Sequence, residues 1–445
     1  MSLKRGVGMV AAAAILASPS AAANGNGRIV YSDGSKLYAV ESGGGAPMPL
    51  RAGFNPAFSP DGARLAFEQW TGDGFEVDVA AADGSNPVRV AAVPAAARLI
   101  WSPDGTRIGF VSGTYVSGFA LTVANADGSG STTASQDASG NAPPTWSPDG
   151  TELAFATAND IDIAVVNATG GGRRLLIQDS TNDTAPSWSP DGSQIAFFRG
   201  GYGTYRLYSI RPDGSGLHQL GQVSAGTGSP PAWSSDGSHI VFGGSEIVGY
   251  SRYGPVYREN VYAVASDGAG ERRLTDSWSY QAGSNPSWSP DGQRILLTTT
   301  RLRSGGGSQL FEMNPDGSCE TQLASSSFGI SSASWQALGG LTTAEPIRCA
   351  ALSLTGTLTA SIDHPALDGS RIYVYRGTIT NNGNVMSDPI RFTTESDSGP
   401  FTYVSATASG GDCVAKADVS CSLPPLAPGG SATVELRFMA FVSGG

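Results

Sequence analysis

The sequence predicts an all-β fold, a β-propeller, from a repeated phrase, its spacing and the strand-like residues beside it. The phrase is an aromatic residue followed by Ser-Pro-Asp-Gly, and six near-copies begin at Phe58, Trp101, Trp146, Trp188, Trp233 and Trp288. These aromatic residues lie 43, 45, 42, 45 and 55 positions apart, and a degraded copy around Trp335 follows after another 47. A period of about 40 to 50 residues with strand-like flanks is typical of propeller blades.

Each copy of the phrase has the residues of a tight turn between two strands. Proline presets φ for the first turn position, aspartate tolerates the second, and glycine accepts the left-handed conformation. A strand follows at once, as in Arg64-Leu65-Ala66-Phe67 and Arg107-Ile108-Gly109-Phe110. We therefore interpret the aspartates as turn residues. The alternative, calcium binding, would need the several acidic residues at alternate positions of an EF-hand loop.

A second hairpin fills each period, so that one period holds four strands, a to d. Its turns are mostly Asp-Gly and are centred on residues 83–84, 127–128, 170–171, 213–214, 267–268 and 316–317. The strands before them are apolar or alternating, as in Leu207-Tyr208-Ser209-Ile210. Four antiparallel strands per repeat make one blade.

The two ends of the repeat region set the expected number of blades. Strand-like segments at residues 28–31, 36–40 and 48–50 correspond to b, c and d but have no a strand, while residues 333–336 form an a strand with no followers. Pairing these ends would complete a split blade and remove the free sheet edges. The sequence thus predicts seven blades, with six or eight as the alternatives if the repeat count is wrong by one.

The repeat resembles the β-propeller repeat of TolB-like periplasmic proteins, a relative of the WD repeat. The resemblance rests on the phrases and the paired Asp-Gly turns and covers about residues 28–338. It implies the fold and not one particular function. TolB-type proteins also carry an α/β domain before the propeller, and nothing in this sequence matches such a domain.

The first residues have the pattern of a secretory signal peptide. Lys4 and Arg5 precede an apolar run at 7–16 and an Ala-x-Ala pattern, which predicts cleavage after residue 23. The run is too short to span a membrane, and no later stretch is long and apolar enough to do so. We expect a mature chain that is soluble after cleavage, secreted or periplasmic, with no membrane insertion. The formal net charge of −11 also argues against nucleic acid as a partner.

The sequence predicts a second domain after the propeller. The propeller is placed at residues 24–340, a linker at 341–348 and the second domain at 349–445. The latter has alternating strands at the spacing of a β-sandwich, at residues 351–354, 373–380, 401–404 and 432–438. It resembles the Ig-like domain repeated in many bacterial surface proteins, where such domains are spacers or adhesion modules.

Four cysteines fit an oxidising compartment. Cys413 and Cys421 match the paired cysteines of the Ig-like pattern, so the resemblance implies a bridge between them. Cys319 follows the last c–d turn and Cys349 follows the closing strand, and a bridge between these two would fasten the linker to the final blade. Metal binding is the weaker interpretation, because there is no Cys-x-x-Cys and histidine is scarce.

Signals of catalysis are sparse in this sequence. There are three histidines, His218, His239 and His364, and the first two are expected on surface strands or turns. There is no Gly-x-Ser-x-Gly elbow. The sequence predicts no catalytic residue, no metal and no cofactor, and it leaves open whether the protein is an enzyme, while favouring a protein that is not. Paired carboxylates stay open, because their pairing in space is not visible in a sequence.

The expected binding surface is the face that carries the d–a and b–c loops. These loops share one face by antiparallel parity, vary in length and are rich in aromatic residues and arginine, which dominate binding hot spots. The longest insertion spans residues 243–260. The candidate binding residues are Trp70, Tyr250, Arg252, Tyr253, Tyr257, Trp278 and Tyr280. The alternative is a long loop that packs locally.

The sequence favours a monomeric propeller that acts as a binding scaffold for an unknown protein or glycan of the cell envelope. The alternative function is a carbohydrate-active lyase or hydrolase that works in the central pocket, for which carboxylates or histidines should gather at one channel mouth. The d–a loop ends supply Asn55, Asn141, Asp183 and Asn285 to the channel, which favours binding.

Overall fold

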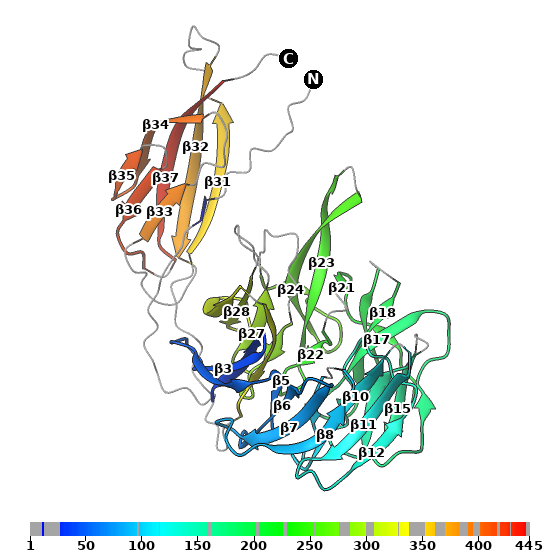
Figure 1. Cartoon of the computed structure of the whole chain (residues 1–445). Helices are drawn as coiled ribbons and strands as arrows, with labels where there is room; N and C mark the ends of the chain where they lie inside the picture. Colours follow the sequence, from blue (N-terminus) through cyan, green and yellow to red (C-terminus); the bar gives the residue numbers. More distant parts are fainter. Residues whose placement is uncertain are drawn as a thin grey trace. The chain divides into compact units, whose positions relative to one another are not determined.

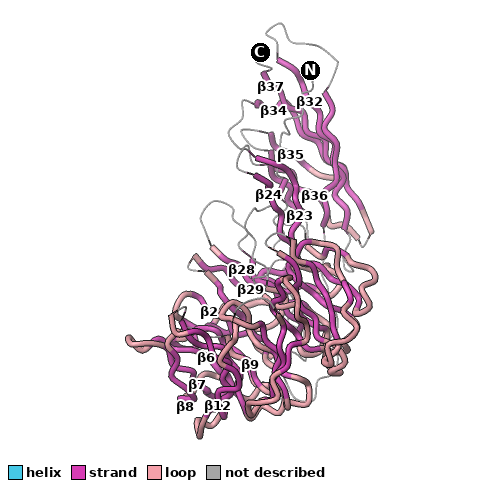
Figure 2. Tube along the Cα trace, turned by 90° about the vertical axis from the view of Figure 1, so that its right-hand side faces the viewer, coloured by secondary structure: helices cyan, strands magenta, loops and turns pink. Residues whose placement is uncertain are grey.

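The computed structural model describes residues 11–12, 27–95, 98–114, 116–158, 162–201, 204–225, 229–251, 254–275, 285–299, 307–327, 329–337, 352–360, 370–381, 390–394, 401–415, 419–427 and 429–441. The chain divides into two compact units, one of residues 21–346 and one of residues 347–445 together with residues 1–20. Every element in the described ranges is a strand, and the fold is all-β, as predicted (Figure 2).

The larger unit is a β-propeller (Figure 1). Within its described residues it has six four-stranded antiparallel sheets and one sheet of five strands. From inner to outer strand, the sheets are β30 (Ile330–Trp335), β2 (Ile29–Asp33), β3 (Lys36–Val40) and β4 (Met48–Ala52); β5 (Phe54–Phe58), β6 (Arg64–Trp70), β7 (Phe75–Ala81) and β8 (Val88–Val93); β9 (Ile100–Trp101), β10 (Arg107–Thr114), β11 (Gly118–Asn125) and β12 (Ser131–Ser135); β13 (Thr145–Trp146), β14 (Glu152–Ala156), β15 (Ile163–Asn167) and β16 (Arg174–Leu175); β17 (Asn182–Trp188), β18 (Ile195–Gly200), β19 (Arg206–Ile210) and β20 (His218–Gln219); β21 (Ser224–Ala225) and β22 (Ala232–Trp233), β23 (His239–Ser251), β24 (Gly254–Ala265) and β25 (Arg272–Arg273); and β26 (Ser287–Trp288), β27 (Ile295–Thr299), β28 (Ser308–Met313) and β29 (Thr321–Ser326).

The repeated phrase forms the turn between the first two strands of its sheet. In the first copy, the backbone N–H of Ala63 donates to Asp61 Oδ1 (3.0 Å), the backbone N–H of Arg64 donates to Ser59 Oγ (2.9 Å), and Gly62 has a φ of +67°. The copy at Asp104 repeats this network, and its hydrogen bonds, chiefly from Ser102, lower the pKa of the carboxyl to about 2. The turn interpretation of these aspartates is therefore confirmed.

The phrase aromatics lie between neighbouring sheets, as the repeat pattern predicts. Each of the seven contacts between neighbouring sheets has an apolar core that contains one of them: Phe58, Trp101, Trp146, Trp188, Trp233, Trp288 or Trp335. Four indole N–H groups also donate to a carbonyl oxygen of the preceding inner strand: Trp101 to Ala57 (2.8 Å), Trp146 to Ile100 (3.3 Å), Trp233 to Ser187 (3.0 Å) and Trp288 to Ala232 (3.1 Å). The indole therefore fixes both the spacing and the register of adjacent sheets.

The two ends of the propeller region pair in one sheet, as predicted. Strand β30 pairs antiparallel with β2, with Trp335 opposite Ile29. Beyond this strand, Gln336 Nε2 donates to the carbonyl oxygen of Gly62 in the first phrase turn (2.8 Å). A Cβ atom at Gly62 would lie 1.7 Å from the carbonyl oxygen of Ala337, so only glycine fits at this close approach.

The segment predicted as a long loop at residues 243–260 has a different structure. Strands β23 and β24 continue through it as a hairpin in register from His239 opposite Ala265 to Ser251 opposite Gly254 (Figure 1). The extra length of β23 also lets it pair with both β21 and β22, which makes this the five-stranded sheet. The insertion lengthens two strands because its residues can extend the existing backbone ladder.

The smaller unit contains two four-stranded sheets. Their orders are β31 (Leu352–Ala360), β32 (Ser370–Asn381), β37 (Ser431–Phe441) and β34 (Phe401–Ala408), and β1 (Ala11–Ala12), β33 (Ile390–Thr394), β36 (Val419–Leu423) and β35 (Asp412–Ala415). Both sheets contribute to one core. A disulfide joins Cys413 to Cys421, as the resemblance implies. Cys319 is also disulfide-bonded, whereas Cys349 lies outside the described residues.

The Ig-like assignment of this unit and the signal peptide stay predictions. Strand β1 belongs to the segment predicted as the signal peptide, and it pairs with Thr393 and Thr394 of β33. The remaining residues of that segment, and the linker at 341–348, lie outside the described ranges.

Candidate functional site

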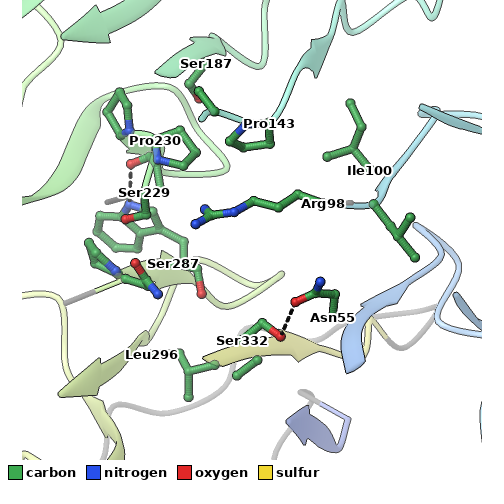
Figure 3. Close-up of a pocket in the computed structure, with 18 of the residues that line it drawn as sticks. Asn55, Arg98, Ile100, Pro143, Ser187, Ser229, Pro230, Ser287, Leu296 and Ser332 are labelled. Carbon is green, nitrogen blue, oxygen red and sulfur yellow. Dashed lines mark hydrogen bonds between the residues drawn. The ribbon is translucent and has the colours of Figure 1, made fainter. Parts of the chain in front are cut away.

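The candidate site is the central cavity of the propeller, which the inner strands surround. Its volume is about 810 Å³. The side chains three positions before the phrase aromatics supply six of its described lining residues: Asn55, Arg98, Pro143, Pro230, Asn285 and Ser332. The inner strands therefore present equivalent positions of successive repeats to one shared space (Figure 3).

The described lining combines small polar groups with apolar walls. Proline rings at Pro56, Pro143, Pro230, Pro231 and Pro286, and aliphatic groups such as Leu99, Ile100 and Leu296, face the same cavity as the hydroxyls of Ser187, Ser229, Ser287 and Ser332. Such a lining of apolar walls with a few placed polar groups is typical of a ligand pocket.

Asn55 is held in place at the edge of the cavity. Its Nδ2 donates to Glu68 Oε2 (3.1 Å), and its Oδ1 accepts from Ser332 Oγ (3.3 Å; Figure 3). Glu68 is fully buried. These bonds fix the orientation of the Asn55 amide and join the sheets of β5 and β30 at the cavity wall.

Arg98 is the ionisable residue of the described cavity lining. Its side chain projects into the space between Asn55 and Ser229 (Figure 3). The side chain is accessible to solvent inside the cavity, and the surrounding walls partly desolvate its charge and lower the pKa of Arg98 from its ordinary value. A guanidinium stays protonated even so, and it presents donors only. The cavity therefore carries a positive charge in a chain whose net charge is −11.

Two further donors of the lining residues are buried and have no acceptor among the described residues. They are Trp188 Nε1 and Ser229 Oγ. Trp188 thus differs from the four phrase tryptophans whose N–H groups bond the preceding strand. A buried donor without a partner costs about 1–3 kcal/mol, so these two groups are suited to meet an acceptor from outside the protein.

The four channel residues expected from the sequence divide into two groups. Asn55 and Asn285 line the cavity, while Asn141 and Asp183 are absent from its described lining. Asp183 is fully buried and forms an ion pair with Arg199 (Oδ2 to Nη1, 2.8 Å), which also pairs with Asp179. Burial outweighs the attraction of the shared guanidinium and raises the pKa of Asp183 to about 7.

Asp183 is expected to make the protein less stable as pH rises from about 4 to about 7. Its pKa is near 3.8 when unfolded and about 7 when folded, so in this range the folded state binds the additional proton. The free energy of unfolding then falls by up to about 1.4 kcal/mol per pH unit. Urea unfolding at several pH values should show a flatter profile for Asp183→Asn. Asp83→Asn, at an exposed turn, should keep the wild-type slope, and equal slopes in all three proteins would refute the assignment.

The predicted aromatic patch is described only in part. The Trp70 side chain is 54% exposed at the end of β6 and contacts the Phe75 ring edge-on, with ring centroids 5.0 Å apart. Tyr250 and Tyr257 belong to the β23–β24 hairpin. Arg252, Tyr253, Trp278 and Tyr280 lie outside the described residues, so their grouping stays a prediction.

Histidine and metal chemistry have little support in the described ranges. His218 and His239 are exposed, as expected, and His364 lies outside those ranges. Within the part of the chain that the structure describes, no group of three or more His, Cys, Asp or Glu side chains is placed to hold a metal ion. The same part contains no helix with the length and hydropathy needed to span a bilayer.

Arg98 is the main site residue that the sequence interpretation missed. The signal was present, because Arg98 stands three positions before Trp101, just as Asn55 stands before Phe58 and Asn285 before Trp288. Comparing this one position across the repeats would have shown a single charged residue among polar and apolar ones.

Comparison with known proteins identifies the class of the propeller. Residues 50–236 match the family model of the TolB beta propeller domain, so this region is a TolB-type β-propeller. No curated protein matches the chain.

Solved structures with a similar fold include two TolB proteins. TolB from Acinetobacter baumannii is 18% identical, with a TM-score of 0.45 over 70% of this chain and 66% of that one, just under two thirds of its length. A putative TolB from Agrobacterium tumefaciens is 21% identical, with a TM-score of 0.42 over 60% of this chain and 94% of that one. An oligogalacturonate lyase in complex with manganese is 18% identical, with a TM-score of 0.46 over 59% of this chain and 79% of that one.

Proposed function

We propose that this TolB-like propeller is a non-catalytic binding scaffold of the cell envelope, which takes a protein or glycan partner on the face that carries the d–a and b–c loops. The observation that carries the proposal is the chemistry of the cavity that opens among the d–a loop ends. Its described lining offers hydroxyls, amides, proline rings and one guanidinium. These groups bind and orient a ligand.

General acid–base catalysis needs a group that gains and loses a proton near neutral pH. The lyase or hydrolase alternative would therefore place carboxylates or histidines beside the bound sugar. Among the described lining residues the ionisable group is Arg98, which stays protonated. The residues that line the described cavity thus support binding better than sugar cleavage.

The exposed aromatic residue of the same face supports a macromolecular partner. Trp70 ends the b strand of its sheet, so by antiparallel order it lies on the face of the d–a loops. An exposed tryptophan supported by a second ring is a typical anchor of an interface. The candidate surface also includes Tyr250, Arg252, Tyr253, Tyr257, Trp278 and Tyr280.

An envelope location follows from two features taken together. The Cys413–Cys421 disulfide persists in an oxidising compartment. The TolB-type domain and the predicted signal peptide fit a secreted or periplasmic protein that works as a monomer.

The proposal is tested by capture from envelope extract and by a glycan array, with the full chain as bait. Trp70→Ala is expected to weaken capture of the partner at least tenfold while the melting temperature changes by less than about 2 °C, because the side chain is half exposed. Val116→Ala serves as the control, since Val116 is exposed and is not an aromatic anchor. Cleavage of an arrayed glycan would favour the lyase or hydrolase, and failure to capture any protein or glycan would refute the scaffold.

A further inference from the structure

We propose that the central cavity binds the C-terminal carboxylate of an extended peptide, with Arg98 as the residue that recognises it. The inference rests on the proposed binding function and names the ligand group that the cavity takes. It starts from the position of Arg98, whose guanidinium projects into a cavity of about 810 Å³ lined by six or more separate strands and loops (Figure 3).

The charges of the described lining select an anion. Arg98 supplies a positive charge there, and no aspartate or glutamate is among the described lining residues, although the chain has 38 of them. A guanidinium binds a carboxylate through two parallel hydrogen bonds. The walls exclude much of the surrounding water, which strengthens such a pair compared with one on the open surface.

The uncharged donors of the cavity fit the same group. Ser229 Oγ and Trp188 Nε1 are buried donors that find no acceptor among the described residues. An indole N–H can only donate, and an ionised carboxylate can only accept. A carboxylate at the guanidinium, followed by peptide carbonyl groups, supplies the acceptors that these donors lack.

The number of charges and the shape of the walls favour a peptide end over an acidic glycan. A peptide C-terminus brings one carboxylate, which matches one guanidinium. An oligouronate brings one carboxylate per sugar ring, and a second carboxylate in this cavity would be desolvated without a described cation. The Trp188 ring is buried in the contact between sheets, so it offers no open face for a sugar to stack on. Proline rings and Leu99 and Ile100 suit the side chains of an extended peptide.

The test uses a pool of N-acetylated octapeptides with free C-terminal carboxylates and the same pool with C-terminal amides. Each pool is equilibrated by dialysis against the full chain, and the retained peptides are identified by mass spectrometry. We expect retention of peptides from the free-acid pool and loss of retention when the same peptides are amidated. Equal retention of both pools, or no retention of any free-acid peptide, would overturn the proposal.

Variants then locate the site with the best retained peptide as a fluorescent probe. Arg98→Gln is expected to raise the Kd about thirtyfold or more, and Arg98→Lys to give an intermediate value, because lysine keeps the charge and loses the paired hydrogen bonds. Arg89→Gln makes the same charge change at an exposed ion pair with Glu76 and should leave the Kd unchanged. Ser229→Ala should raise the Kd several-fold without lowering the melting temperature, since it removes no described internal bond.

These results are separable from the test of the scaffold function. If Arg98→Gln binds the peptide as well as wild type does, the carboxylate site is refuted even if envelope capture succeeds. If oligogalacturonate binds in an Arg98-dependent manner and no peptide does, the ligand is an acidic glycan and the peptide proposal is wrong. If free-acid peptides bind through Arg98 while nothing is captured from the envelope extract, this inference stands and the scaffold proposal fails.

Discussion

Replacing Trp146 by alanine is expected to lower the free energy of unfolding by about 3–5 kcal/mol, the usual cost of removing a buried tryptophan. The Trp146 side chain is 7% exposed and packs between two sheets, against Leu121 of one and Leu153 of the other. Its indole N–H also donates to the carbonyl oxygen of Ile100 (3.3 Å). The substitution therefore leaves a large cavity and an unpaired carbonyl at the contact between the sheets.

Chemical denaturation of the wild-type protein and the variant measures this loss. Trp146→Phe keeps part of the ring volume and loses the hydrogen bond, so an intermediate loss is expected. Trp70→Ala is the matched control, because the same residue type at an exposed position should change the free energy of unfolding by less than about 1 kcal/mol. A loss below about 1 kcal/mol for Trp146→Ala would show that the phrase aromatics do not hold the sheets together.

The propeller could be predicted because its determinants are local and repeated. Ser59, Asp61 and Gly62 act within five residues of one another, so the turn that they form is visible in the sequence. Pairing of Trp335 with Ile29 is a long-range contact, yet it followed from counting strands at the two ends. Repetition thus turns a long-range question into a local one.

The content of the cavity was harder to predict, because it depends on which side chains converge from distant repeats. Asp183 was expected in the channel, and the fold instead buries it beside Arg199, which is 16 residues away on the neighbouring strand. The insertion at 243–260 was expected as a loop, although its residues extend a ladder that both flanking strands had already begun. In each case the result depends on cross-strand register, which spacing alone does not specify.

Buried ion pairs between sheets are a further feature that the sequence did not indicate. Arg294 and Glu312 are 3% and 0% exposed, and Arg294 Nη1 lies 3.3 Å from Glu312 Oε2. The Glu312 carboxylate also accepts from Ser42 Oγ (3.0 Å) and from the backbone N–H of Gly43 (2.6 Å). Ser42 and Gly43 follow β3 in the sheet that joins the two ends of the propeller region, some 270 positions before Glu312. This network therefore fastens the end-joining sheet to the sheet beside it.

Removing one partner of this network is expected to destabilise the protein by about 3–5 kcal/mol, since Glu312→Ala leaves the Arg294 charge buried and uncompensated. Replacing both partners, as Arg294→Met with Glu312→Leu, should restore most of the lost stability, because a packed apolar pair costs no desolvation of charge. Arg376→Ala, which breaks an exposed ion pair with Glu435, is the control and should change the free energy of unfolding by less than about 1 kcal/mol. Urea denaturation gives the free energies, and limited proteolysis reports whether the end-joining sheet opens first. A single variant as stable as wild type, or a double variant no more stable than the single one, would show that the pair does not fasten these two sheets.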